Sequence, residues 1–196
     1  MTALRAGLRA GEIIGLQPGD IDFTSGFIYI RRTIVNGRIT TPKSGKARKV
    51  DISRQLAETL NEHLLEVKKE KLQKGWKELP TWLFYNEMGN HIDPDHLRKR
   101  CFYKSLEKAG LRRIRFHDLR HTFASLLLAQ GESLTYVRDQ LGHSSIQTTL
   151  DTYGHLVPGS NRGAVDKLDD PQPDRNQTAT KPQPEAKKAP SGSLSA

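Results

Sequence analysis

Apolar residues near the N-terminus recur at a spacing that predicts a helix. The pattern covers residues 4–16, and its apolar positions are Leu4, Leu8, Ile13 and Leu16. It ends near Gly15, where Gly-Leu-Gln-Pro-Gly has the composition of a loop. We therefore expect one helix ahead of the first strand.

The following segments have the composition and alternation of strands. Residues 27–35 are rich in β-branched and aromatic side chains, and residues 48–52 alternate polar and apolar positions. Between these segments lies Asn36-Gly37, the dipeptide that type I′ hairpin turns favour, so residues 38–42 are predicted to run back along residues 27–35. Together the three segments predict a small antiparallel sheet.

Helical periodicity dominates the chain from residue 53 to residue 168. Ser53 can cap a helix that runs to about Gln73, with an apolar face made of Leu56, Leu60, Leu64, Leu65 and Leu72. Residues 82–85 form a short apolar element whose type the pattern leaves open. Asp93-Pro94 is a helix start and Gly110 a stop. Further helices are predicted near 117–130, 133–141, 145–153 and 161–168.

These elements predict an α+β fold: a mainly helical domain, residues 1–168, with a small antiparallel three-stranded sheet near the N-terminus. From residue 169 onward the composition changes, because this stretch holds five of the ten prolines and Leu194 is its only large apolar side chain. Such a segment buries too little apolar surface to offset the entropy of ordering it. We expect residues 169–196 to be a disordered, Pro-rich tail.

The charge of the chain favours a polyanionic partner. Lys and Arg number 31 against 22 Asp and Glu, a formal net charge of +9. The four basic and four acidic residues of the tail cancel, so the excess belongs to residues 1–168. Nucleic acid is the first candidate partner and an acidic membrane surface the second.

Composition also indicates a cellular compartment. No apolar run reaches the roughly 20 residues that span a bilayer, and the N-terminus has no long apolar core of a signal peptide. The single cysteine, Cys101, excludes an intramolecular disulfide framework, and we expect it to be packed in a helix. We expect a soluble protein of the cytoplasm.

Two arginines suggest a site for a phosphodiester. Cleavage of this group gathers negative charge on its non-bridging oxygens, which fixed guanidinium groups stabilise through paired hydrogen bonds. Arg120 lies three residues after His117, so both share one helix face and can reach one anion. Arg9 is the second candidate, and Glu12 lies three residues further on, where its carboxylate could orient the guanidinium.

The remaining chemistry needs a nucleophile and an acid. Tyr153, near the end of a short predicted helix, could form a phosphotyrosine that keeps the energy of the broken bond, so rejoining needs neither ATP nor metal. Lys43, in the turn Thr41-Pro42-Lys43-Ser44-Gly45-Lys46, could protonate the leaving 5′ oxygen, and Lys46 is an alternative in that turn. His143, after Gly142, could donate a hydrogen bond to the phosphate.

At these residues the chain resembles the tyrosine recombinases, also called phage integrases. The resemblance covers nearly all of residues 3–168 and runs in order through Gly7-Leu8-Arg9-Ala10-Gly11-Glu12, the Lys43 turn, His117-Asp118-Leu119-Arg120-His121-Thr122, Leu141-Gly142-His143-Ser144 and Thr152-Tyr153-Gly154-His155. Type IB topoisomerases are similar in mechanism, but the second histidine and the Leu-Gly-His spacing are more like those of recombinases.

The resemblance implies a role for each residue and a set of partners. It implies phosphate binding by Arg9, Arg120 and His143, a general acid at Lys43, an acid or base at His117 and a covalent nucleophile at Tyr153. It also implies double-stranded DNA as substrate, a homotetramer on paired recombination sites, and no cofactor or metal.

The short segment ahead of Arg9 bears on the expected activity. Family members normally carry a core-binding domain ahead of the catalytic domain, whereas eight residues precede Arg9 here, so we expect that domain to be absent. An alternative function is therefore a truncated, catalytically impaired remnant that only binds DNA.

His117 and His121 have a spacing that suits zinc, but Asp118 stands where a zinc protease has Glu. We expect no metal, and a structural or supporting role for His121.

Overall fold

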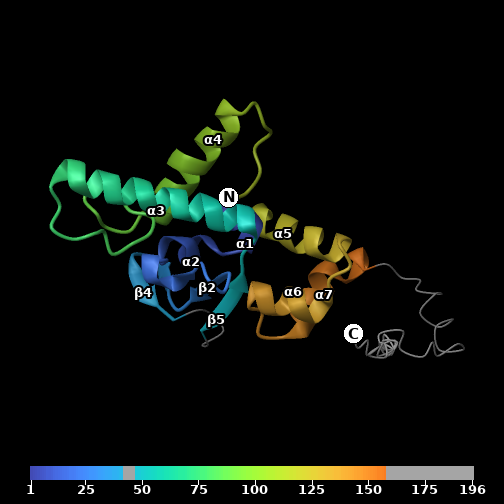
Figure 1. Ribbon diagram of the computed structural model, residues 1–196. Coiled ribbons are helices and arrows are strands. Elements are labelled where there is room, and N and C mark those ends of the chain that lie inside the picture. Colours follow the sequence, from blue (N-terminus) through green and yellow to red (C-terminus); the bar gives the residue numbers. More distant parts are fainter. Residues whose placement is uncertain (42–46, 158–196) are drawn as a thin grey trace, which may run out of the picture. The chain divides into compact units, whose positions relative to one another are not determined.

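A computed structural model of the chain describes residues 1–41 and 47–157 (Figure 1). Lys43 and Lys46, the predicted helix at 161–168 and the predicted tail at 169–196 lie outside the described residues. Within the described part, no helix is long and apolar enough to cross a membrane.

The described elements make the predicted α+β fold, with helices predominating and a small antiparallel sheet near the N-terminus. The α-helices are α1 Thr2–Ala6, α2 Ala10–Ile14, α3 Arg54–Lys74, α4 Tyr103–Lys108, α5 Asp118–Ala129, α6 Leu134–Leu141 and α7 Ile146–Tyr153. Two 3₁₀ turns, η1 Pro18–Asp20 and η3 Gly154–Leu156, and a π-helix, η2 His96–Phe102, complete the helical elements. The strands are β1 Ile21–Asp22, β2 Phe27–Ile30, β3 Thr33–Val35, β4 Arg38–Thr40 and β5 Arg48–Asp51.

The prediction of a single N-terminal helix is wrong, because the segment breaks into α1 and α2. Gly7 ends α1 in the left-handed conformation, with φ of 62°. A Cβ at this position would lie 2.4 Å from Cδ1 of Phe123, which shows how closely α1 packs on α5. Glycine alone combines that backbone with that contact. Arg9 is therefore the N-cap residue of α2 and is not part of α1.

The predicted strand pairing is also wrong in part. Residues 27–35 form two strands in two sheets: β2 lies between β1 and β5 in an antiparallel three-stranded sheet, and β3 pairs with β4 as a separate hairpin. The break falls at Arg31 and Arg32, because both guanidinium groups bind the buried carboxylate of Asp20. The hairpin turn itself is as predicted, with positive φ at both Asn36 and Gly37.

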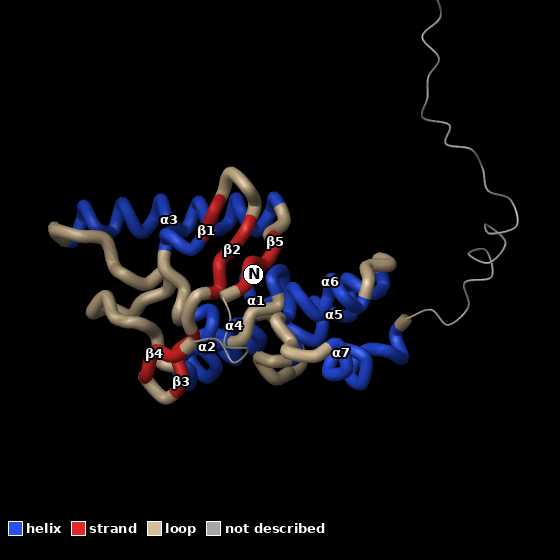
Figure 2. The backbone as a smooth tube through the Cα atoms, turned by 90° about the horizontal axis from the view of Figure 1, so that it is seen from below, coloured by secondary structure: helices blue, strands red, loops and turns tan. Residues whose placement is uncertain are grey.

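A first core lies between the sheet, α1, α2 and α3. It contains Ala3, Ala6, Leu8, Ile13, Leu16, Ile21, Ile28, Ile30, Val50, Leu56, Leu60 and Leu83. Figure 2 shows α3 running beside the three-stranded sheet, and Ser53 caps this helix by accepting a hydrogen bond from the amide of Leu56. The predicted apolar face of α3 is too wide, since Leu65 is 47% exposed and Leu72 is 81% exposed.

The segment between α3 and α5 carries little of the core. Residues 82–85 are irregular, with an isolated antiparallel bridge from Tyr85 to His91. Asp93 accepts hydrogen bonds from the next helix start, as predicted, and Gly110 follows α4 with φ of 64°. Cys101 is exposed on η2, which contradicts the prediction that it is packed. The reason is that none of the residues of η2 and α4 is buried.

A second core joins α5, α6 and α7, which have nearly the predicted bounds. Its buried residues are Phe123, Ala124, Leu128, Val137, Leu141 and Tyr153. Ser133 and Ser145 cap α6 and α7 by accepting backbone hydrogen bonds, and Gly142 ends α6 in the left-handed conformation with φ of 63°. This packing fixes the end of α6 beside α5, and the candidate site lies around that end.

Candidate active site

The C-terminal end of α6 holds two arginines from distant parts of the chain. Arg120 of α5 is 2% exposed and donates two hydrogen bonds of 2.6 Å, to the carbonyls of Gly7 and Leu141. Arg9 donates to the same Leu141 carbonyl at 3.5 Å. Burial, and then the charge of Arg9, lower the pKa of Arg120 to about 9. Two guanidinium groups therefore converge on one carbonyl oxygen, and an anion placed there would meet both.

A buried carboxylate organises the arginines further. Glu12 is 1% exposed and accepts from the amide and guanidinium of Arg9, each at 2.9 Å, and from both terminal nitrogens of Arg48, at 2.9 and 3.0 Å. Burial alone would raise the pKa of Glu12, but its bonds to Arg48 and Arg9 lower it to about 2. Glu12 is thus ionised at neutral pH, and it fixes the guanidinium groups of both partners.

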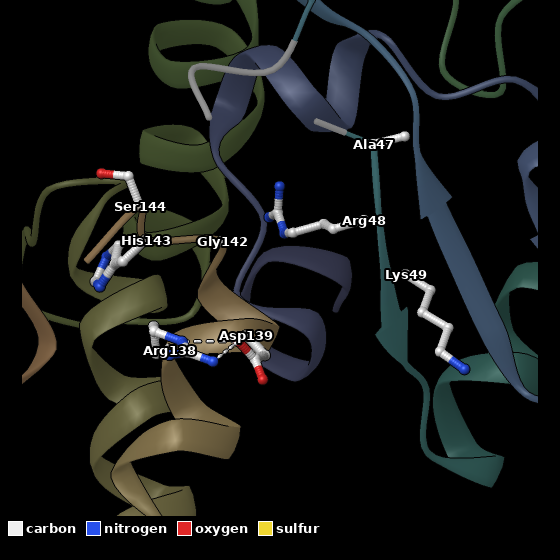
Figure 3. A pocket seen from close by; sticks show the side chains of 8 residues that line it. All are labelled: Ala47, Arg48, Lys49, Arg138, Asp139, Gly142, His143 and Ser144. Carbon is white, nitrogen blue, oxygen red and sulfur yellow. Dashed lines mark hydrogen bonds and ion pairs between the residues drawn. The ribbon is translucent and has the colours of Figure 1, made fainter. Parts of the chain in front are cut away.

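Arg48 is a member of this cluster that the sequence argument did not select. It reaches from β5 toward Gly142 (Figure 3). Its Nε donates to the carbonyl of Gln140, in the last turn of α6, at 3.3 Å. A Cβ on Gly142 would lie 2.6 Å from this side chain. An open pocket of about 630 Å³ begins here, lined by Ala47, Arg48, Lys49, Arg138, Asp139, Gly142, His143 and Ser144.

His143 follows Gly142 and borders this pocket. Its Nδ1 lies 2.9 Å from Oγ1 of Thr149, a fully buried residue of α7. Burial, followed by the charges of Arg120 and Arg9, lowers the pKa of His143 to about 4. The ring is therefore neutral at pH 7, and if Nδ1 accepts the threonine proton, the Nε2 hydrogen is available to a ligand.

His117 lies at the N-cap of α5, on the side of the arginine cluster. Its ring is exposed and packs edge-on against His121, with 5.0 Å between centroids. Partial burial, and then the charge of Arg120, lower its pKa. The lowered pKa favours the neutral form of the His117 ring.

Tyr153 is the last residue of α7 and belongs to the second core. It is 4% exposed, so its side chain is almost completely enclosed by the second core. Its hydroxyl oxygen lies 2.8 Å from Nδ1 of His121. Burial raises the pKa of Tyr153, and the charge of Arg120 opposes that rise. The hydroxyl is thus near the charge of Arg120 and within hydrogen-bond distance of an imidazole nitrogen.

The structure brings five of the six predicted site residues together. The charges of Arg9 and Arg120 both act on His117 and His143, and Arg120 also acts on Tyr153. Lys43, the sixth, lies outside the described residues. Within residues 1–41 and 47–157, no group of three His, Cys, Asp or Glu side chains is arranged to hold a metal ion.

Sequence reasoning missed Arg48 and gave His121 only a structural or supporting role. Arg48 starts a predicted strand of alternating residues, and nothing local links it to Glu12, which is 36 positions away. His121 had a detectable signal, because it lies one helical turn from His117 and directly follows Arg120. Its contact with Tyr153 depends on the packing of α7 against α5.

A small sheet, a helical body, and arginines, histidines and a tyrosine around one helix end are the features of a tyrosine recombinase catalytic domain. The chain belongs to the phage integrase family, whose family profile matches residues 1–159.

Individual relatives agree with this assignment. The chain is 34% identical over 188 residues to a XerC-like tyrosine recombinase of Caldanaerobacter subterraneus subsp. tengcongensis, covering 87% of this chain and 48% of that protein. It is 35% identical over 186 residues to the ICEBs1 integrase of Bacillus subtilis, covering 86% and 47%. The chain thus spans about half the length of these curated relatives.

A solved structure shows the same fold. The integrase of the transposon Tn1549, in complex with circular intermediate DNA, superposes with a TM-score of 0.66 at 25% identity. The match covers 85% of this chain and 57% of that one.

Proposed function

We propose that this chain is the catalytic part of a site-specific DNA recombinase that cleaves and rejoins strands through a covalent 3′-phosphotyrosyl intermediate. The observation that carries the proposal is the convergence of Arg9 and Arg120 on the carbonyl of Leu141. Two cations held this way can bind the two non-bridging oxygens of one phosphate. The family of the chain supplies the reaction class.

The arginine cluster is the phosphate site in this proposal. Arg9 and Arg120 stabilise the charge that develops on the phosphoryl oxygens, and neutral His143 donates a further hydrogen bond. Glu12 keeps the Arg9 guanidinium in place and does not itself touch the DNA. Because these groups are already positioned in the free protein, little reorganisation is needed when the transition state forms.

Tyr153 attacks the phosphorus atom and the 5′ oxygen leaves. Lys43 donates the proton to that oxygen, and His117 assists as an acid or base near the phosphate. The reverse reaction, on a 5′ hydroxyl of another strand, completes the exchange without a cofactor, because the phosphotyrosine retains the energy of the original bond.

The proposed partner is double-stranded DNA in the cytoplasm. The net charge of +9 supports this, as does the DNA in the structure of the related transposon integrase. We propose residues 1–168 as the catalytic domain and a tetramer on paired sites as the active assembly. Exchange of one pair of strands requires two tyrosines, one acting on each duplex. A tetramer provides two such pairs of tyrosines, one pair for each of the two strand exchanges.

The test uses a pool of nicked DNA duplexes with randomised sequence around the nick. Cleavage next to the nick releases a short fragment by diffusion, so the enzyme stays covalently attached to DNA. We expect a protein–DNA adduct that survives denaturation, and sequencing the attached DNA identifies a preferred duplex. Tyr153→Phe should abolish the adduct, since only the hydroxyl is removed.

Tyr29→Phe is the matched control, because it removes a hydroxyl from β2 outside the site. It should leave the adduct yield unchanged. An adduct that persists in Tyr153→Phe would remove the proposed nucleophile. Binding of the pool that weakens with salt, without any adduct from the wild-type chain, would favour the alternative of a DNA-binding module.

A further inference from the structure

The contact between His121 and Tyr153 joins two helices at the proposed reaction centre. Nδ1 of His121, on α5, lies 2.8 Å from the hydroxyl oxygen of Tyr153, on α7. The two rings have centroids 5.8 Å apart and are tilted by 55°. The hydrogen bond is therefore short and made directly to the oxygen that is proposed to attack phosphorus.

We propose that His121 is the general base that accepts the phenolic proton of Tyr153 during DNA cleavage. This inference rests on the proposed function of the site. It differs from the assignment of His117, which reaches the phosphate side of the site and contacts the ring of His121.

The proton and the bonds balance as follows in the cleavage step. The Oη–phosphorus bond forms as the Oη–H bond breaks, and the proton moves to Nδ1 of His121. The phosphorus–5′ oxygen bond breaks at the same time, and the leaving oxygen takes a proton from the general acid. In the rejoining step, the 5′ hydroxyl attacks phosphorus and returns its proton to the general acid, which lost one during cleavage. The Oη–phosphorus bond breaks, and the departing Tyr153 oxygen recovers its proton from His121.

Burial of the tyrosine makes a protein base necessary. Tyr153 is 4% exposed, and its surroundings in the second core are apolar, so bulk water has little access to its hydroxyl. Burial also raises the pKa of this phenol, which keeps it protonated at neutral pH. A phenol in this state needs an acceptor that is already in hydrogen-bond contact when attack begins.

A carboxylate on the same helix lies near His121. Asp118 is one turn earlier on α5, and the His121 ring contributes to lowering the carboxyl pKa of Asp118, after the larger effects of Arg115. A negative charge near the ring stabilises the imidazolium that proton transfer from Tyr153 forms.

The first test uses the protein alone and needs no DNA. The base must accept from Tyr153 in the resting state, so its proton must lie on Nε2. Long-range proton–nitrogen NMR on ¹⁵N-histidine protein, with His121→Asn to assign the signal, reports this tautomer. We expect the Nε2–H form at pH 8. A proton found on Nδ1 would make His121 the donor and overturn the inference.

The second test measures single-turnover adduct formation with the duplex recovered from the randomised pool. His121→Ala should slow the step at least about 100-fold, and added imidazole should restore part of the rate. His121→Asn distinguishes a role in proton transfer from a role in holding the tyrosine. Its amide oxygen can accept the tyrosine hydrogen bond but cannot take the proton. It should be as slow as His121→Ala, and a rate near that of wild type would reduce His121 to a positioning residue.

A further comparison identifies the step affected. A duplex with sulfur in place of the 5′ oxygen has a leaving group that needs no acid, so it should restore the rate of Lys43→Ala but not that of His121→Ala. His155→Ala, an exposed histidine two residues from Tyr153, is the matched control and should react normally.

The outcomes separate the inference from the function beneath it. If the wild-type chain forms an adduct that depends on Tyr153 and His121→Asn forms it equally fast, the function stands and the base assignment falls. If the wild-type chain forms no adduct, the function falls and the catalytic role of His121 falls with it. The NMR result then still reports whether the hydrogen bond runs from Tyr153 to His121.

Discussion

Replacing Glu12 with Gln should destabilise the protein strongly, although the change alters one atom. Glu12 is 1% exposed, and its two oxygens receive four hydrogen bonds from Arg9 and Arg48. A glutamine offers one oxygen, and its amide nitrogen would face a guanidinium donor. Arg48, whose side chain is 10% exposed, would keep its charge in a buried site without a countercharge.

The magnitude follows from the electrostatics of the carboxyl group. Its pKa falls from an ordinary value of 4.5 to about 2, and this depression corresponds to about 3 kcal/mol at 1.36 kcal/mol per pKa unit. Removing one partner of a buried ion pair costs about 3–5 kcal/mol in other proteins. Both routes predict that Glu12→Gln loses about 3 kcal/mol at pH 7, a large part of the stability of a domain.

The loss should also depend on pH with a definite sign. Because the folded-state pKa is depressed, the ionised carboxylate stabilises the fold fully above pH 4.5, and this stabilisation disappears as pH falls toward about 2. Glutamine mimics the protonated group. The difference in unfolding free energy between wild type and Glu12→Gln should therefore shrink between pH 5 and pH 3.

Urea unfolding of both proteins, followed by far-ultraviolet circular dichroism, measures this difference. Glu58→Gln, at an exposed position on α3, is the matched control and should change stability by less than about 0.5 kcal/mol. A loss below about 1 kcal/mol for Glu12→Gln at pH 7, or a loss that does not change with pH, would refute the role given to this carboxylate.

Two other changes probe the packing around the site. Gly7→Ala should cost about 2 kcal/mol or more, because φ is 62° and the new Cβ would overlap the ring of Phe123 at 2.4 Å; thermal unfolding measures it, and Gly19→Ala, with open space around it, should have little effect. Tyr136→Phe removes a 2.7 Å hydrogen bond to Asp51 that ties α6 to β5 and should cost about 1 kcal/mol in urea unfolding. An unchanged midpoint would show that this bond adds nothing to stability.

Local signals predicted most of the helical body correctly. Ser53, Ser133 and Ser145 each cap the helix that the sequence placed there, and Gly142 ends α6. These features act within a few residues of themselves, so the sequence displays them directly.

Strand partners and the broken N-terminal helix depended on distant residues. The alternation at 27–35 says that the segment is extended but not which strand lies beside it, and the deciding contacts are those of Arg31 and Arg32 with Asp20. Likewise, the break at Gly7 is explained by Phe123, more than a hundred positions later. Such contacts exist only after the chain has folded.

The site residues were predicted by pattern and resemblance, whereas their mutual support was not. Ordered motifs indicated Arg9, Arg120, His143 and Tyr153, and their assigned roles stay predictions that the adduct experiments test. Arg48 escaped notice because its partner Glu12 is on another element. The sequence thus indicated candidate groups for the chemistry, and the structure added the contacts that hold them.

The single turn at the end of α6 has a mechanical consequence. Carbonyls of Gln140 and Leu141 hold Arg48, Arg9 and Arg120, which come from three separate segments. The negative end of the helix dipole faces these cations and offsets part of their mutual repulsion. The spacing of the three guanidinium groups therefore depends on the position of α6 as well as on the carboxylate of Glu12 and the carbonyl of Gly7.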